Sequence, residues 1–153
     1  TVDETGGERF KTRMELDEPG ELPPHLHPIA EESYEVIAGE LEVQVDGEWS
    51  TVTAGEKVVI PPNTEHAFRN TGRVEVINVH QPAMQFGEFF RGFHRLKTER
   101  GVPMPPDGLK SAILLAMLVV EHEDEQRLVS PPHWVFKILA RLGHLIGYRL
   151  PDN

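Results

Sequence analysis

The sequence of 153 residues contains no cysteine. This absence excludes disulfide bonds, a thiol nucleophile, an iron–sulfur cluster and any zinc site with cysteine ligands. Long apolar runs are also missing, because the most apolar stretch, residues 109–121, is too short and too closely flanked by charges to span a bilayer. The first residues carry neither the basic segment nor the apolar segment of a secretory signal. We therefore expect a cytoplasmic protein with no membrane span.

Basic side chains are scarce relative to acidic ones. The chain has 15 Lys and Arg against 25 Asp and Glu, which gives a formal net charge of −10. Because an acidic surface repels phosphate backbones, we expect no nucleic-acid partner. The imbalance lies in the first part of the chain: residues 1–80 carry 17 acidic and 6 basic side chains, whereas residues 81–153 carry 8 and 9.

Before residue 82, apolar residues alternate with polar ones in short runs. In residues 41–45, for example, every second residue is Leu or Val. Glycine, proline and asparagine separate these runs, and Asp46-Gly47 is typical of a two-residue hairpin turn. Many short strands with regular turns predict an antiparallel sandwich or barrel over residues 1–82.

After residue 82, the apolar spacing changes to that of helices, and we predict three of them, over residues 86–96, 109–121 and 132–148. The last carries a basic face and an apolar stripe, the stripe being formed by Trp134, Val135, Ile138, Leu139, Leu142, Leu145 and Ile146. We expect this extension, residues 83–153, to pack on the barrel or on a second subunit of a homodimer. Binding to a membrane surface explains the same stripe, but it fits the acidic remainder of the chain less well.

Two histidines separated by one residue, His25 and His27, are the first candidates for a functional site. On a strand, both imidazoles project from the same face, and neutral imidazole is a common ligand of first-row transition metals. A His-x-His pair alone is weak evidence in a chain with eight histidines. Four others are expected to have no special role: His94, His122, His133 and His144.

The residues around this pair form a longer pattern. Gly20 precedes it, Glu32 follows His27 by five residues, and Gly39 closes the block; a second block runs Gly55, Pro61-Pro62-Asn63, His66 and Asn70. Together the blocks resemble the two sequence motifs of the cupin superfamily over about residues 9–82. Two positions depart from the motifs. Gly20 stands one residue closer to the first histidine, and Asn63 replaces a glycine, a mild change because Asn tolerates the left-handed conformation.

The resemblance implies a fold and a ligand set. The fold is an antiparallel double-stranded β-helix, or jelly-roll barrel, here followed by the helical appendix. The ligands of one divalent transition metal are then His25, His27, Glu32 and His66, with the metal being Fe, Mn, Ni, Cu, Co or Zn. Glu31 is a possible alternative ligand, but Glu32 keeps the motif's six-residue spacing to Gly39. Such a set leaves open coordination positions, as catalytic metal sites do.

By the same resemblance, the protein is a metal-dependent oxidoreductase of the dioxygenase-like kind, acting on a small enolic, phenolic or carboxylate substrate. Related chemistry includes decarboxylation and isomerisation with the metal as a Lewis acid. Glu32 is then both a ligand and a catalytic proton acceptor. The alternative is a non-catalytic module that binds or senses a small molecule, because fold and ligands do not fix function.

Other side chains in the first part of the chain have more than one interpretation. Barrel-lining side chains are expected at Met14, Tyr34, Val36 and Phe68, where they form either a substrate pocket or plain core. His80 ends the last β-run and points either inward, as an acid or base, or outward. Arg69 and Gln44 could contact an anionic substrate, although a surface role is the simpler expectation for both.

Overall fold

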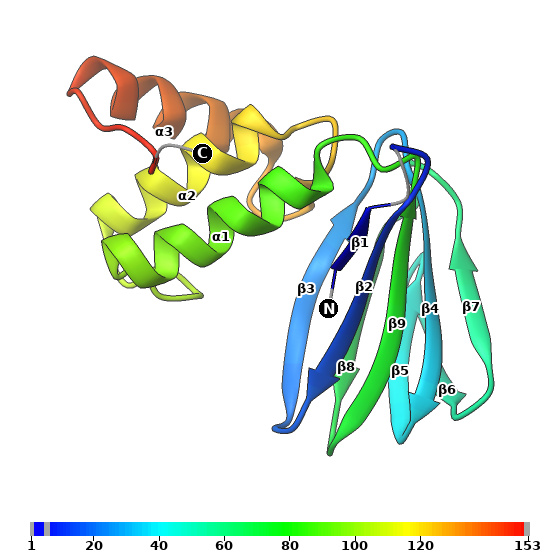
Figure 1. Ribbon diagram of the computed structural model, residues 1–153. Helices are drawn as coiled ribbons and strands as arrows, with labels where there is room; N and C mark the ends of the chain where they lie inside the picture. The colour runs from blue at the N-terminus through cyan, green and yellow to red at the C-terminus, as the bar shows by residue number, and fades with distance from the viewer. Residues whose placement is uncertain (1, 5–6, 152–153) are drawn as a thin grey trace. The chain divides into compact units, whose positions relative to one another are not determined.

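The computed structural model describes residues 2–4 and 7–151. The chain divides into two compact units, Thr1–Met84 and Gln85–Asn153, which contain the strands and the helices labelled in Figure 1. The division lies two residues beyond the boundary at residue 82 that the sequence suggested. That each unit is a separate domain stays a prediction.

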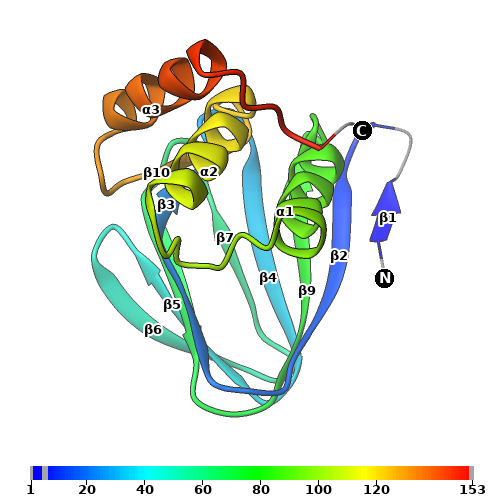
Figure 2. The ribbon, with the colours of Figure 1, turned by 90° about the vertical axis from the view of Figure 1, so that its left-hand side faces the viewer.

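The first unit consists of antiparallel strands in two sheets. Its strands are β1 (Val2–Glu4), β2 (Phe10–Leu16), β3 (Gly20–Leu26), β4 (Glu31–Ala38), β5 (Glu40–Val45), β6 (Glu48–Thr53), β7 (Lys57–Ile60), β8 (His66–Asn70) and β9 (Val74–Gln81). One sheet has the order β1-β2-β9-β4-β7, and the other contains β3-β8-β5-β6. In Figure 2, β5 and β6 lie on the left of the barrel and β2 and β9 on the right. With the three helices that follow, this arrangement confirms the predicted fold class.

Two tight turns set the register of the barrel strands. Asp46 and Gly47 have φ values of 49° and 87°, so both residues of the β5–β6 turn adopt the left-handed conformation that a type I′ hairpin needs. Gly39, between β4 and β5, has a φ of 81°, and a Cβ atom there would lie 2.4 Å from the carbonyl oxygen of Arg73. Only glycine fits this position without moving the backbone.

The barrel interior is apolar at one end and polar at the other. The apolar part is a cluster of buried side chains: Tyr34, Val36, Leu41, Val43, Val52, Ile60, Val74 and Val76, with the half-buried Met14 and Phe68 packed against it. Inward positions follow the two-residue period of the strands. Along β9 they run from Val74 and Val76 to Asn78 and His80, all buried. The polar end of this series is where the candidate site lies.

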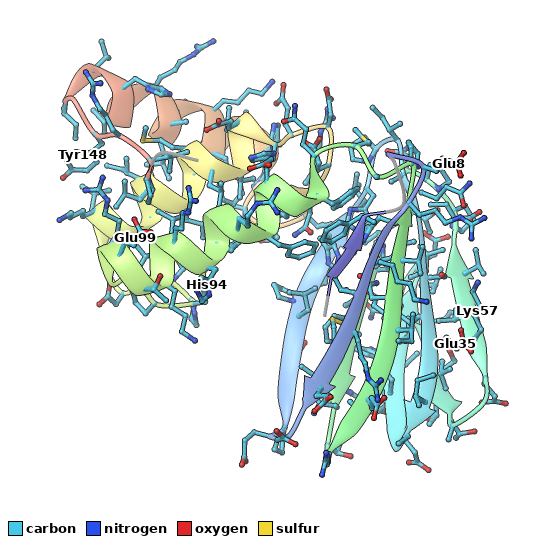
Figure 3. The ribbon with its side chains drawn as sticks, viewed as in Figure 1. Glu8, Glu35, Lys57, His94, Glu99 and Tyr148 are labelled. Atoms are coloured by element: carbon cyan, nitrogen blue, oxygen red, sulfur yellow. The ribbon has the colours of Figure 1, made fainter. Side chains whose placement is uncertain are left out.

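A pair of opposite charges lies on the outer face of the barrel. Glu35 on β4 and Lys57 on β7 are cross-strand partners, and both are exposed on the outside of the sheet (Figure 3). Opposite charges directly across a strand pair are mildly favourable, and they keep this face hydrated.

The second unit contains α1 (Phe86–Arg100), α2 (Leu109–Glu121), the two-residue strand β10 (Arg127–Leu128) and α3 (His133–Leu145). The helix α1 ends at Gly101, whose φ of 65° is the usual left-handed helix stop. The helix α2 is buried on nearly all sides and packs along α3. Within the described residues, none of the helices combines the length and the apolar character that a membrane crossing requires.

The packed face of α3 includes only part of the apolar stripe that the sequence suggested, the half-buried Val135 and Leu139. The buried residues are Phe136, Ala140 and Gly143. A Cβ atom at Gly143 would lie 2.6 Å from the sulfur of Met117 on α2, so a small residue lets the two helices approach closely. The larger members of the stripe are exposed instead, with Trp134 at 63% and Leu145 at 85%.

Candidate metal centre

A bulge in β3 places the first histidine of the site. Leu22 pairs with Phe68 and His25 pairs with His66 on β8, so β3 contains one extra residue between these two pairs. The extra residue falls at Pro23-Pro24, and proline is tolerated in a strand where the ladder of hydrogen bonds is interrupted. The bulge therefore sets His25 directly opposite His66.

His27 lies just beyond the end of β3 and is fixed by its backbone. Its carbonyl oxygen accepts a hydrogen bond of 2.7 Å from the backbone N–H of Asn63, in the loop between β7 and β8. Asn63 has a φ of 58°, so it adopts the left-handed conformation expected of the residue that replaces glycine. The loop that leads to His66 is thus tied to the segment that carries His27.

Glu32 reaches the same point from the opposite sheet, as the second residue of β4. The candidate ligand atoms of His25, His27, Glu32 and His66 all lie within 4.8 Å of one another, and the four side chains are buried. Glu31, the alternative ligand, is exposed. The four histidines expected to have no special role lie in the second unit: His94, His122, His133 and His144. Every one of the four predicted ligands therefore belongs to a single cluster between the two sheets.

Backbone carbonyls orient two of the imidazoles. Nδ1 of His25 donates to the carbonyl oxygen of Pro23 at 2.9 Å, and Nδ1 of His66 donates to that of Thr64 at 2.8 Å. In a neutral imidazole, a proton on Nδ1 leaves the lone pair on Nε2. Metal-binding histidines in proteins are generally held in this way, with the second nitrogen donating to a carbonyl or carboxylate.

The Nε2 atoms of His27 and His66 converge on the carboxylate of Glu32. Its Oε2 atom lies 2.6 Å from Nε2 of His66 and 3.0 Å from Nε2 of His27. Because Nδ1 of His66 already holds a proton, a neutral His66 places a lone pair against a carboxylate oxygen, and this contact needs a proton or a cation. Three nitrogens and one oxygen are also a donor set that suits a first-row transition metal. The residues present therefore fit a divalent ion.

The electrostatics favour neutral imidazole beside an ionised carboxylate. Burial lowers the pKa of His25 to about 3, with His66 adding to the effect. Burial alone would raise the pKa of Glu32, but the surrounding His80, His27 and His66 hold it well below its usual range. Unprotonated imidazole and ionised carboxylate are the forms that bind metal ions.

Three residues outside the predicted set also contact Glu32. Asn78 donates a hydrogen bond of 2.7 Å to Oε1, and Nε2 of His80 lies 3.1 Å from the same atom. The hydroxyl of Tyr34 also hydrogen-bonds Glu32; burial and this carboxylate raise the pKa of Tyr34 well above its usual range. The sequence had one signal for the β9 pair: both have the strand parity of the apolar Val74 and Val76. That parity alone left the direction of His80 open.

The other candidates lie away from the cluster. Arg69 pairs with Glu42 at 2.8 Å and stacks over the ring of Trp49, 4.2 Å from its centre. These partners satisfy its charge on the side of the barrel that faces solvent. Gln44 is half-buried on β5.

Comparisons with known proteins cover the barrel. Residues 12–80 match the family described as "Cupin domain". A polyketide synthase, CurC, from Streptomyces cyaneus is 43% identical over 58 residues, which is 37% of this chain and 38% of that protein. The HTH-type transcriptional regulator SutR from Escherichia coli K12 is 36% identical over 69 residues, or 45% of this chain and 38% of that one. The match thus spans about two fifths of each relative.

A solved structure supports the same fold. KdgF from Halomonas sp. superposes with a TM-score of 0.51 at 22% identity, over 54% of this chain and 76% of that one. At this level of identity, the similarity speaks for the fold alone. The matched family, the two-sheet barrel and the buried His-His-Glu-His group agree with one another, and they identify residues 12–80 as a cupin domain.

Proposed function

We propose that the barrel is a metal-dependent enzyme of the dioxygenase-like kind, acting on a small enolic, phenolic or carboxylate substrate. The observation that carries the proposal is the buried cluster of His25, His27, Glu32 and His66. Four protein ligands around an ion that accepts six leave two positions for a substrate with two oxygens. A structural metal site is instead closed by its protein ligands.

A divalent ion in this cluster would supply Lewis acidity, favouring the deprotonated oxygen of a bound enol or phenol, and a redox-active ion would add reactivity toward O2. The chain's own residues have other tasks. Glu32 is ionised, so it can receive the proton that the substrate releases if its carboxylate detaches from the ion. Tyr34 keeps its proton at neutral pH and donates a hydrogen bond to Glu32, and this supports the carboxylate.

The neighbourhood of the cluster favours an apolar or aromatic substrate. Tyr34 and Phe68 pack edge to face, with ring centres 5.5 Å apart, beside the half-buried Met14. The name of the Streptomyces relative agrees with an enolic substrate, because polyketide chains carry 1,3-dicarbonyl groups that enolise readily. The enolate of a 1,3-dicarbonyl offers two oxygens at the spacing that chelation needs.

The alternative proposal is a barrel that senses a small molecule without converting it. The relative described as a transcriptional regulator supports this interpretation, since a similar segment there belongs to a regulatory protein. The metal would then serve to bind the ligand. The two proposals differ in turnover. An enzyme converts many substrate molecules per site, whereas a sensor binds one molecule per site and leaves it unchanged.

The first experiment is metal analysis of protein purified without chelator or added metal, by inductively coupled plasma mass spectrometry. We expect close to one transition-metal ion per chain. Oxygen consumption with 1,3-diketones and catechols then tests the enzyme, and calorimetric binding of the same compounds tests the sensor. Protein that is free of metal and takes up none on reconstitution would contradict both proposals.

We also propose a homodimer. The observation in favour is the exposed apolar face of α3, formed by Trp134, Ile138, Leu142, Leu145 and Ile146. Contiguous apolar surface of this kind marks sites of contact with other molecules. A second copy of the chain brings the same face, as a twofold interface requires.

A further inference from the structure

The two oxygens of the Glu32 carboxylate have different surroundings. Oε2 faces the metal-binding histidines, at 2.6 Å from His66 and 3.0 Å from His27. Oε1 faces β9, where Asn78 lies at 2.7 Å and His80 at 3.1 Å. The carboxylate is thus divided between one set of ligands and one set of hydrogen-bond donors.

The backbone fixes the donors on β9. Glu32 is the direct cross-strand partner of His80, and Tyr34 is that of Asn78. All of these side chains are at most 3% exposed, so neither contact is a chance meeting of mobile surface groups. The amide of Asn78 also lies 3.4 Å from the carbonyl oxygen of Ser33, which limits its rotation.

We propose that Asn78 and His80 are positioning residues that keep Oε1 of Glu32 occupied, so that this carboxylate offers a metal ion one oxygen and not two. The inference rests on the proposed metal site. A carboxylate without such donors is free to turn and bind through both oxygens, thereby using a position that a substrate needs. Hydrogen bonds to ligating carboxylates are known to tune metal sites in this way.

The residue types suit the task. The amide of Asn78 donates without carrying a charge, so it orients the carboxylate and leaves the negative charge of Glu32 available to the ion. His80 donates through Nε2, which places its proton on the side of Glu32. A buried carboxylate oxygen without hydrogen-bond donors would lose its hydration without a compensating hydrogen bond, which is unfavourable.

The test uses the full-length chain with Co²⁺ as the only added probe. We expect Asn78→Ala and His80→Phe to lower the affinity for Co²⁺ by about 10- to 100-fold and to change the visible d–d spectrum, which reports the number and geometry of ligands. His80→Gln keeps an N–H donor near the same place and should restore most of the affinity. The matched control is Asn70→Ala, because Asn70 is a buried asparagine whose amide holds the carbonyls of Glu18 and Gly72 and does not touch Glu32.

The outcomes separate the inference from the proposed function. If the wild-type protein binds no Co²⁺, the metal site fails and the inference fails with it. If the wild type binds but Asn78→Ala and His80→Phe keep its affinity and spectrum, only the inference is wrong. Lower affinity with an unchanged spectrum would show a merely structural role and also overturn it. A crystal structure of the Co²⁺-loaded wild type provides a test that does not depend on variants: we expect Glu32 to bind through Oε2 alone, and binding through both oxygens would refute the inference.

Discussion

The most notable exceptions to the usual distribution of polar and apolar side chains differ between the two units of this chain. The barrel buries polar and ionisable groups at one end of its interior, with Glu32, His66, Asn78 and His80 almost fully enclosed. The helical unit exposes large apolar ones, with Trp134, Ile138 and Leu145 each more than half exposed. Each arrangement opposes the usual preference of the residues concerned.

Both exceptions carry a free-energy cost, and the cost indicates where each unit acts. Burying a carboxylate among histidines is unfavourable unless charge and hydrogen bonds are satisfied, so the polar end of the barrel indicates a site for an ion and its substrate. A contiguous apolar surface on a helix is unfavourable in water, so α3 indicates a contact with another molecule. We therefore expect the barrel to act through its interior and the helical unit through its surface.

The largest expected effect is that of Glu32→Gln on the barrel. The substitution removes the negative charge of the proposed ligand set and leaves the size of this side chain almost unchanged, so we expect metal affinity to fall by about 100-fold or more. Competition with a chelator, read by mass spectrometric metal analysis, measures the change. Glu31→Gln is the matched control, since Glu31 is an exposed carboxylate on the same strand. Equal metal occupancy in both variants would contradict the proposal that the polar end of the barrel binds a metal through Glu32.

A second comparison concerns glycine. Gly39→Ala in the barrel should lower the free energy of unfolding by about 3 kcal/mol, because the new Cβ meets backbone atoms and the φ of 81° is unfavourable for alanine. Gly143→Ala in the helical unit should cost only about 1 kcal/mol, because the nearest atoms belong to the flexible side chain of Met117 and to Ile113. Urea denaturation measures both. Similar losses would show that the helix contact is as rigid as the barrel turn.

The metal-free barrel should become less stable as pH falls. His25 has a pKa of about 3 in the folded chain against an ordinary value of 6.5, so between these values the unfolded state binds a proton that the folded state does not. Stability therefore rises with pH across this window, and at pH 5 the loss amounts to about 2 kcal/mol. Glu32, whose pKa is lowered, acts in the same direction below about pH 4.5. Thermal melts after chelation, at pH 7.5 and pH 5, give the difference.

Two variants show whether this pH dependence comes from the interior. His25→Gln should reduce the pH dependence of the melting temperature, since it removes one titrating group, while His80, whose pKa burial also lowers, keeps the remainder. His94→Gln should leave it unchanged, because His94 is exposed on α1 (Figure 3). If the melting temperature of His25→Gln changed with pH as steeply as that of the wild type, the acid sensitivity would belong to other groups.

The smallest effect on stability is expected for the apolar face of α3. Leu145→Asp should change the stability of a single chain by no more than about 0.5 kcal/mol, because Leu145 is 85% exposed. It should nevertheless convert the proposed homodimer into a monomer of 17.3 kDa, as measured by light scattering after size-exclusion chromatography. His144→Asp places the same acid one residue away, off the apolar stripe, and should leave the dimer intact. A monomeric wild type would contradict the dimer proposal.

Much of the fold could be predicted from the sequence, because local pattern and packing agree there. The helix α2 spans Leu109–Glu121, the range that its apolar composition indicated. The facing of α3 could not be predicted, since apolar residues occur on both its sides. The choice between them depended on the small Ala140 and Gly143, which allow close approach to α2.

The site shows the same division. The spacing of His25, His27, Glu32 and His66 could be recognised because motif residues occupy fixed positions along neighbouring strands. The contacts that Asn78 and His80 make with Glu32 could not be predicted. The reason is that β9 has apolar residues on both faces, with Ile77 and Val79 half-buried on the face opposite to Asn78 and His80. Which face pointed inward was decided by the pairing of β9 between β2 and β4, a long-range property of the sheet.

The central position of β9 has a consequence for the order in which the site can form during synthesis. The ribosome releases Glu32 long before His66, which follows 34 residues later, and Asn78 follows 46 residues later. Until β9 has emerged and inserted between β4 and β2, the carboxylate of Glu32 lacks its contacts with Asn78 and His80. Such non-local pairing is slow compared with helix formation. A nascent chain therefore passes through a stage in which His25, His27 and Glu32 are already translated but the strand that supports Glu32, β9, is still missing.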